Sequence, residues 1–253
     1  MRFVTAFVVA FVVAAGALPA ALAAPTADYA IVHSYPHDTR AWTEGLYFWQ
    51  GNFYESTGLY GRSSIRRVNL STGAVLQKRR LPDSVFGEGM AIAGGRLFVI
   101  TWKERRALVY NPTSLSRLGR YDYAGEGSGL TYNGEHLVMS NLTSRIRFRN
   151  PTNFNTVRSI TVTENGAPVD QLNALAWVNG KIWANIWLVP DILIIDPANG
   201  HVLRRLDFSS LQAHEEGIGD ARDMNGIAYL KSADRLFVTG KFWKHVYEIE
   251  ALP

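Results

Sequence analysis

The sequence predicts an all-β fold, a five-bladed β-propeller. Three observations favour it: a fivefold internal repeat, a hairpin signal inside each repeat, and little helical periodicity beyond the amino end. The intervals between repeats are 44, 40, 45 and 52 residues, a period typical of four-stranded blades. Each repeat opens on a polar, a small and an apolar residue: Glu44-Gly45-Leu46, Glu88-Gly89-Met90, Ser128-Gly129-Leu130, Asn173-Ala174-Leu175 and Asn225-Gly226-Ile227.

Each repeat continues with a predicted hairpin. Its turn is rich in Gly and Asn, as in Gly94-Gly95 and Asn179-Gly180, because these residues tolerate the positive φ of tight turns. The segment Tyr29 to Tyr35 precedes the first repeat, and we expect it to pair with the last blade and close the ring. Leu206 to Ala213 is expected to form a short helix, followed by an exposed His214-Glu215-Glu216.

The amino end is distinct from the repeats. Met1 and Arg2 precede an apolar run from Phe3 to about Ala24, a pattern typical of a secretory signal peptide. We therefore expect residues 1–23 to be a signal peptide and residues 24–253 to form one five-bladed propeller catalytic domain. The length of the run leaves an uncleaved membrane anchor as an alternative. The expected location is periplasmic or secreted, without stable membrane association after cleavage.

The amino-acid composition limits the disulfides, cofactors and binding partners that the protein is expected to have. The chain has no cysteine, so an exported fold would depend on a large β core rather than on disulfides. The formal net charge of +4 is mild, and the interspersed charges indicate solvated strand faces rather than a nucleic-acid surface. The six His show no metal-ligand spacing. We expect a monomer with no metal or other cofactor and no nucleic-acid partner.

Equivalent residues of a propeller converge on its axis, so the polar residues that open the repeats predict a ring around one pocket. Glu88 lies between two glycines, and partial burial there would raise its pKa and suit it to proton transfer near neutral pH. A Glu that only binds neighbouring amides is the alternative. Trp102, Trp187 and Lys241 share a later repeat phase and predict a mostly apolar pocket with a few polar groups.

The longer motifs resemble the plant and bacterial type of glutaminyl-peptide cyclotransferase, the glutamine cyclotransferases. The resemblance covers nearly all of the chain beyond the amino end and implies a five-bladed propeller. Such a protein converts an N-terminal glutaminyl residue of a peptide or protein to pyroglutamyl, with release of ammonia and without a catalytic metal. The motifs are His37 to Leu46, Tyr54 to Ser64, Gly87-Glu88-Gly89, Thr101-Trp102, Leu172-Asn173, Trp177 to Trp187, Asn225 to Ala228 and Leu236 to Lys241.

The resemblance also implies roles for single residues. Glu88 matches the acid/base glutamate of the family, and Asn173 and Lys241 match polar substrate contacts. Either of these two could donate to the developing oxyanion, so all three are predicted to be catalytic. The remaining predictions are substrate-binding residues: Trp42, Glu44, Phe86, Trp102, Trp187 and Asn225.

Departures from the family pattern are concentrated in the third and fourth repeats. Ser128 stands where the family usually has Trp, Ala174 and Ala176 replace two Glu, and Ser140-Asn141-Leu142 replaces a Ser-Asp-Gly turn. Two other functions therefore remain open. One is a weakened or non-catalytic peptide-binding propeller. The other is a metal-dependent lactonase-type propeller that holds a Ca²⁺-like ion with the oxygens of Glu44, Glu88, Asn173 and Asn225.

Overall fold

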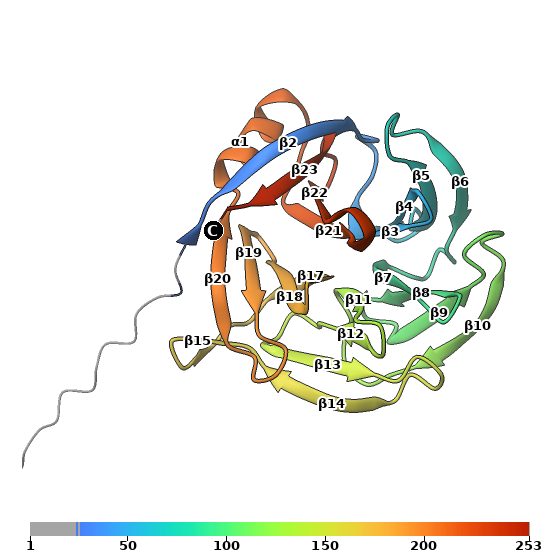
Figure 1. Ribbon diagram of the computed structural model, residues 1–253. Coiled ribbons are helices and arrows are strands. Elements are labelled where there is room, and N and C mark those ends of the chain that lie inside the picture. The colour runs from blue at the N-terminus through green and yellow to red at the C-terminus, as the bar shows by residue number, and fades with distance from the viewer. Residues whose placement is uncertain (1–23, 25, 253) are drawn as a thin grey trace, which may run out of the picture.

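The computed structural model describes residues 24 and 26–252, so the predicted signal peptide lies outside the described residues. Five β-sheets surround a central axis, and Figure 1 shows their outer strands along the rim and their inner strands near the centre. This arrangement confirms the predicted five-bladed β-propeller. In the part of the chain that the structure describes, no helix is long and apolar enough to span a membrane.

Each blade contains an antiparallel sheet of four strands, and in blades one to four these strands follow one another along the chain from the axis to the rim. Blade one contains β3 (Thr43–Trp49), β4 (Asn52–Thr57), β5 (Ser64–Asn69) and β6 (Val75–Arg80). Blade two contains β7 (Gly87–Ala93), β8 (Arg96–Thr101), β9 (Arg106–Tyr110) and β10 (Arg117–Asp122). Blade three contains β11 (Leu130–Tyr132), β12 (Leu137–Met139), β13 (Arg145–Arg149) and β14 (Thr156–Thr161).

Blades four and five involve both ends of the described chain. Blade four contains β17 (Leu172–Val178), β18 (Lys181–Ile186), β19 (Val189–Ile195) and β20 (Val202–Asp207), and β1 (Thr26–Ala27) runs parallel to β20. Blade five contains β21 (Met224–Leu230), β22 (Arg235–Gly240), β23 (His245–Ala251) and β2 (Tyr29–Pro36). The expected pairing of the amino-terminal segment with the last blade is therefore present, as β2 against β23.

Short elements lie between blades three and four, between blades four and five, and within blade five. β15 (Thr163–Glu164) and β16 (Ala167–Pro168) form a small hairpin, and η1 (Lys231–Ala233) is a single 3₁₀ turn. The helix α1 (Ser209–Ile218) begins later than expected and includes Glu215. The prediction that Glu215 is exposed is wrong. Its carboxylate is fully buried because it accepts hydrogen bonds from the Lys244 amide and the Tyr247 hydroxyl, which tie α1 to blade five.

Glycine and asparagine shape the hairpins as the sequence predicts. In the turn between β17 and β18, Asn179 has φ 45° and Gly180 has φ 79°. Positive φ at both central residues gives a turn whose twist matches that of the flanking strands. The turn between β7 and β8 uses Gly94 and Gly95 at φ 54° and 70°. These turns lie at one end of the inner strands, so the residues that open the repeats meet at the other end.

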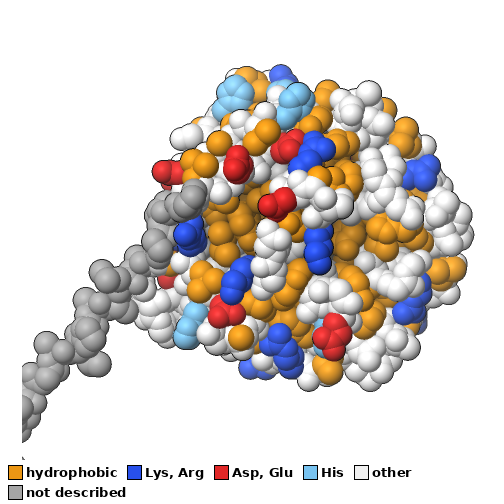
Figure 2. Space-filling model, viewed as in Figure 1, with side chains coloured by type: hydrophobic (Ala, Val, Ile, Leu, Met, Phe, Trp, Pro, Cys, Tyr) orange, Lys and Arg blue, Asp and Glu red, His pale blue; other side chains and the backbone are white. Residues whose placement is uncertain are grey.

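The hydrophobic core is divided between neighbouring blades. One buried cluster joins Ile65 of blade one to Leu97 of blade two, and another joins Phe53 of blade one to Phe237 of blade five. Corresponding clusters fill the other three spaces between blades. Charged side chains of both signs are scattered over the face in Figure 2, with hydrophobic side chains gathered between them. Each blade is therefore stabilised by apolar burial against both neighbours.

β-Bulges explain why the repeats open on a polar and a small residue. The register shifts at the start of β3, β7, β17 and β21, where Glu44, Glu88, Asn173 and Asn225 lie. Such a bulge re-aims a side chain relative to its strand. The following residue is small because inner strands approach closely: a Cβ on Gly89 would lie 2.3 Å from the Leu130 nitrogen.

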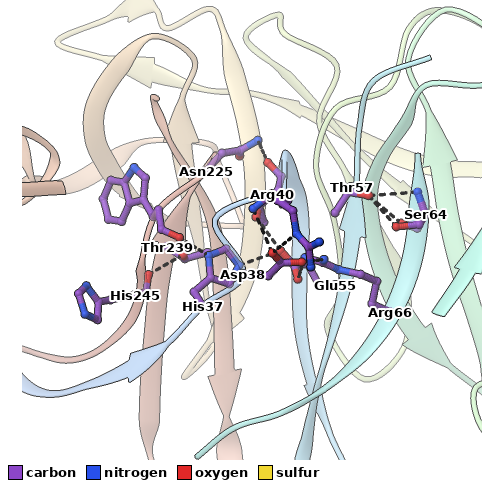
Figure 3. A network of polar contacts seen from close by, with 12 residues as sticks. His37, Asp38, Arg40, Glu55, Thr57, Ser64, Arg66, Asn225, Thr239 and His245 are labelled. Carbon is purple, nitrogen blue, oxygen red and sulfur yellow. Dashed lines mark hydrogen bonds and ion pairs between the residues drawn. The ribbon is translucent and has the colours of Figure 1, made fainter. Parts of the chain in front are cut away.

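A buried charged network supports the entry to blade one (Figure 3). Glu55 accepts hydrogen bonds from the Thr43 hydroxyl at 2.6 Å and from the Arg66 guanidinium, and it lies 3.0 Å from His37 Nε2. Burial favours the neutral carboxyl, but Arg66 and His37 hold the pKa of Glu55 well below its ordinary range. Burial also opposes the charged form of His37, yet Glu55 raises the pKa of this imidazole. The network fixes Thr43, the residue before Glu44.

We expect Glu55→Gln to lower the free energy of unfolding by roughly 3 kcal/mol, because His37 then lacks a buried counter-charge and Arg66 keeps only its ion pair with the partly exposed Asp38. The stabilisation from Glu55 is lost as pH falls below its ordinary pKa of 4.5, and that from His37 is lost as pH rises through its raised pKa, above 6.5. Denaturant unfolding from pH 4 to 9 should therefore show the largest difference between wild type and variant from about pH 5 to 6.5. A pH-independent difference would contradict the charged network.

Candidate active site

A cavity of about 200 Å³ lies at the end of the inner strands that carries the bulges. Eight of the nine site residues predicted from the sequence line it, together with Leu142. The lining residues are Trp42, Glu44, Phe86, Glu88, Trp102, Leu142, Asn173, Trp187 and Lys241. A larger cavity of about 410 Å³ lies among the turns at the other end, but its lining includes no carboxylate. The smaller cavity is therefore the candidate active site, because it gathers the predicted residues.

Glu44 is held on both carboxylate oxygens. Its Oε1 accepts a hydrogen bond from the Trp42 indole at 2.6 Å and lies 3.4 Å from the Lys241 ammonium. Its Oε2 accepts a hydrogen bond from the Asn225 amide at 2.6 Å. Burial raises the pKa of Glu44 to about 7, although Lys241 and Trp42 act in the opposite direction. This carboxylate is fixed in position and changes its charge near neutral pH.

Glu88 is also buried, but its carboxyl is much less engaged. The side chain is only 6% exposed, and its Oε2 has no hydrogen-bond partner. Burial and the adjacent Glu44 raise the pKa of Glu88 well above its ordinary value, with Lys241 opposing them. The environment of Glu88 thus favours the protonated form of its carboxyl, and one oxygen remains available to a ligand.

Lys241 is the cation of the site. Its ammonium lies 3.1 Å from Asp223 Oδ2 and 3.4 Å from Glu44 Oε1. Burial alone would lower the pKa of Lys241, but Glu44 and Asp223 raise it above its ordinary value. An ammonium has three protons to donate, so two carboxylates leave it one more for a group in the cavity.

Aromatic side chains form the walls of the cavity. The rings of Phe86 and Trp102 meet edge to face, with centroids 5.5 Å apart. The Trp102 indole donates to Glu126 at 2.9 Å, which fixes its orientation. Trp187 remains 37% exposed and covers the mouth on the side of blade four. A cavity of this size and lining suits a single amino-acid side chain whose polar end reaches the carboxyl groups.

Two of the five polar residues that open the repeats do not line the cavity. Asn225 was predicted to bind substrate, but it does not line the cavity. Its side-chain amide instead donates to Glu44 and, at 3.1 Å, to the Thr43 carbonyl of the neighbouring blade. Ser128 is buried, and its hydroxyl binds Ser140 and the Leu172 carbonyl. The ring of five polar residues thus supplies Glu44, Glu88 and Asn173 to the cavity.

Leu142 is the one departure from the family pattern that lines the cavity. Ala174 and Ala176 are buried and do not line it. Leu142 occupies the position of the usual turn glycine and has φ 60°, a conformation that L-residues other than Gly, Asn and Asp rarely adopt. Its side chain forms the wall from blade three. Leu142 therefore gives blade three an apolar contact with the cavity, whereas Ser128 does not line it.

Asp223 and Glu126 are site residues that sequence reasoning missed. Asp223 pairs with Lys241, and Glu126 binds the Trp102 indole. Asp223 lies two residues before Asn225, just ahead of the repeat step, and this proximity is the only sequence signal for it. Both act on the site through a residue that lines the cavity.

The lactonase-type hypothesis needs a cage of oxygen ligands around a cation. Within residues 24 and 26–252, no three His, Cys, Asp or Glu side chains are grouped so that they could hold a metal ion. The two carboxyl groups of the cavity lie beside the Lys241 ammonium, whose charge opposes binding of another cation. This arrangement favours proton chemistry over metal binding.

Comparisons with known proteins agree with this geometry. A family model described as "Glutamine cyclotransferase" matches residues 3–251. Glutaminyl-peptide cyclotransferase from Arabidopsis thaliana is 35% identical over 227 residues, which cover 87% of this chain and 70% of the relative. The crystal structure of Myxococcus xanthus glutaminyl cyclase matches with a TM-score of 0.84 and 35% identity, covering 90% of this chain and all of that one. The WD40 propeller of Doa1, at 8% identity and a TM-score of 0.51, shares the fold alone.

Proposed function

Because the chain belongs to the glutamine cyclotransferase family, we propose that it converts N-terminal glutaminyl residues of peptides and proteins to pyroglutamyl residues and releases ammonia. One observation carries the mechanism. A buried carboxyl with an unpartnered oxygen, that of Glu88, shares an aromatic cavity with Glu44 and Lys241. The cavity would take the glutaminyl residue, and the rest of the peptide would leave through the mouth of the cavity.

Glu44 would receive the substrate's α-ammonium. An α-amino group has a pKa near 8, close to the value of about 7 for Glu44, so a proton passes between them at little cost. The neutral amine then attacks the side-chain amide carbon, forming the new C–N bond of the ring. The tight cavity contributes by holding the chain folded back on itself.

Glu88 would complete the proton transfers. Its carboxyl donates a proton to the departing amide nitrogen, and ammonia leaves as the C–N bond breaks. The resulting carboxylate takes the extra proton from the ring nitrogen, so Glu88 ends as it began. Glu44 passes its proton to ammonia, giving ammonium as the net product.

Lys241 and Asn173 would assist at the amide oxygen. Negative charge develops there when the amine attacks, and the third proton of Lys241 can point to it. Asn173 lines the same cavity, and its Oδ1 has no hydrogen-bond partner. That oxygen can accept a hydrogen bond from the substrate amide NH₂ while the Asn173 amide nitrogen donates.

The test is ammonia release from a glutaminyl tripeptide by purified protein, with and without chelator. The N-acetylated peptide is the matched control, because its nitrogen cannot attack. We expect chelator-resistant turnover of the free peptide only. Turnover abolished by chelator would favour the lactonase-type alternative, and binding without turnover by folded protein would favour a peptide-binding propeller.

Glu44→Gln should change the pH dependence of kcat/KM. In the wild type, the acid limb follows Glu44, near pH 7. The variant cannot take the substrate's proton, so only peptide that is already neutral reacts, and the limb moves toward about pH 8. Ammonia release from pH 5 to 10 measures the shift. If the acid limb of the kcat/KM profile does not move, the group that titrates near pH 7 in the wild type is not Glu44.

We also propose that residues 24–253 act as an exported monomer. The apolar amino-terminal run supports export. Cell fractionation and mass measurement of the mature chain test it, and a retained amino terminus in the membrane fraction would instead support an anchor. Light scattering of the purified protein tests the monomer.

A further inference from the structure

A second cavity lies beside the active site on blade one and is strongly basic. Its volume is about 370 Å³, and its charged lining consists of Arg40, Arg62, Arg66, Lys78, Arg80 and Asp38. Lys78 and Arg80 are two apart on β6 and so lie on the same face of this edge strand. Five cations and one carboxylate make this an unusual concentration of charge for a chain whose net charge is +4.

The cations are only partly neutralised. Arg66 pairs with both Glu55 and Asp38, Arg40 also pairs with Asp38, and Arg80 pairs with Asp83 at 2.9 Å. In the described chain, neither Arg62 nor Lys78 has a carboxylate oxygen within 4.0 Å. Burial and the neighbouring arginines Arg66, Arg40 and Arg80 lower the pKa of Lys78, with only Asp38 opposing them. An anion entering this cavity would therefore relieve repulsion between cations.

A single indole separates this cavity from the active site. Trp42 lines both cavities. Gly58 lies against the same partition, since a Cβ there would be 2.4 Å from the Phe86 ring and 2.9 Å from Trp42. A peptide whose first residue occupies the active site needs roughly two further residues, each spanning about 3.4 Å, to pass one side chain. Its third residue can then reach the basic cavity.

Acidic side chains also lie near the active site, and one of them is close to blade one: Glu104 accepts a hydrogen bond from the Tyr60 hydroxyl at 2.7 Å. Glu104 and Glu126 lie close enough to Glu88 to raise its pKa, and Glu126 binds Trp102. The α-ammonium of a peptide is thus attracted to the carboxylates, while a downstream carboxylate is attracted to blade one.

We propose that the cavity lined by Arg62, Lys78 and Arg80 binds a substrate carboxylate about two residues after the glutamine, so that acidic peptides are the preferred substrates. The carboxylate can belong to an Asp or Glu side chain or to the free carboxyl end of a tripeptide. The inference rests on the proposed function, which supplies the occupant of the neighbouring cavity.

The experiment compares kcat/KM for the amidated peptides Gln-Ala-Glu-Ala, Gln-Ala-Ala-Ala and Gln-Ala-Lys-Ala. We expect the Glu peptide to exceed the Ala peptide by about fivefold at low salt, the size of one favourable ion pair. The Lys peptide should be the poorest of the three, and the preference should shrink as salt screens it. Gln-Ala-Ala with a free carboxyl end, against its amide, distinguishes the two sources of the carboxylate.

Lys78→Met and Arg62→Met should each lower the Glu to Ala ratio toward one. Arg79→Met is the matched control, because Arg79 is exposed on the other face of β6 and does not line the cavity. It should keep the wild-type ratio. A wild-type ratio of one, or equal loss in all three variants, would overturn the subsite while leaving the proposed function intact.

A binding measurement distinguishes failure of the proposed anion site from failure of the proposed function. The probe is N-acetyl-Ala-Glu-Ala-amide, which lacks the glutamine, titrated by calorimetry into wild type and Lys78→Met against the same peptide with Lys. One outcome is that glutaminyl peptides are not turned over while the wild type still binds the Glu probe. If Lys78→Met weakens that binding, the result would still support the anion site. Equal or absent binding of both probes, together with no turnover, would overturn both proposals.

Discussion

Glu88→Gln should reduce kcat/KM for glutaminyl peptides by about 10²–10⁴-fold, the range for loss of a positioned general acid and base. An amide can neither give its proton to the leaving nitrogen nor take one from the ring nitrogen. Ammonia release at saturating and at limiting peptide separates kcat from KM. We expect the loss mainly in kcat, because the amide retains the shape of the carboxyl.

The same variant should not unfold. Burial and Glu44 raise the pKa of Glu88 and so favour its neutral form, which the amide matches in charge as well as in size. A carboxyl with a raised pKa reduces stability as pH rises above its ordinary value of 4.5, since the unfolded state releases its proton first. The Tm of the variant relative to wild type should therefore increase with pH.

Glu135→Gln is the matched control, because the Glu135 side chain is 81% exposed in a turn remote from the cavity. It should leave both activity and Tm unchanged. Retention of more than a tenth of the activity in Glu88→Gln would remove Glu88 from the proposed acid and base role. Loss of activity together with a large fall in Tm would instead indicate a structural role.

Repeat phase alone locates much of the site. Glu44, Glu88 and Asn173 open their repeats, and Trp102, Trp187 and Lys241 follow the second strand, so their meeting in one cavity follows from the blade geometry. The small residues that follow can be predicted for the same reason, because the inner strands leave no room for a Cβ at Gly45 or Gly89. The spacing of the repeats therefore predicts which residues lie near the propeller axis.

The direction of a side chain at a bulge is not specified by the period. Asn225 has the same phase as Glu44, yet its amide turns to blade one because the Thr43 carbonyl and Glu44 offer acceptors there. Leu142 became a wall residue through a left-handed backbone conformation, and Glu215 is buried by partners about 30 residues away. These outcomes depend on contacts between blades, which local patterns do not contain.

Lys241→Met should lower kcat/KM by about 10²–10³-fold, the effect of removing one oxyanion donor. Methionine keeps an unbranched side chain of similar length but has no proton to donate. Glu44 would also lose the cation that lowers its pKa, so the acid limb of kcat/KM should move above pH 7. Ammonia release as a function of pH measures both effects on one preparation.

The pH shift separates a direct role of Lys241 from a structural one. Met at this position leaves Asp223 and Glu44 without their buried cation, so some loss of Tm is expected from any role. Repacking alone would lower activity equally at every pH, whereas loss of the charge moves the profile. Lys244→Met is the control, since Lys244 is exposed three residues further on and does not line the cavity. A full-strength Lys241→Met enzyme with an unmoved profile would assign the oxyanion to Asn173.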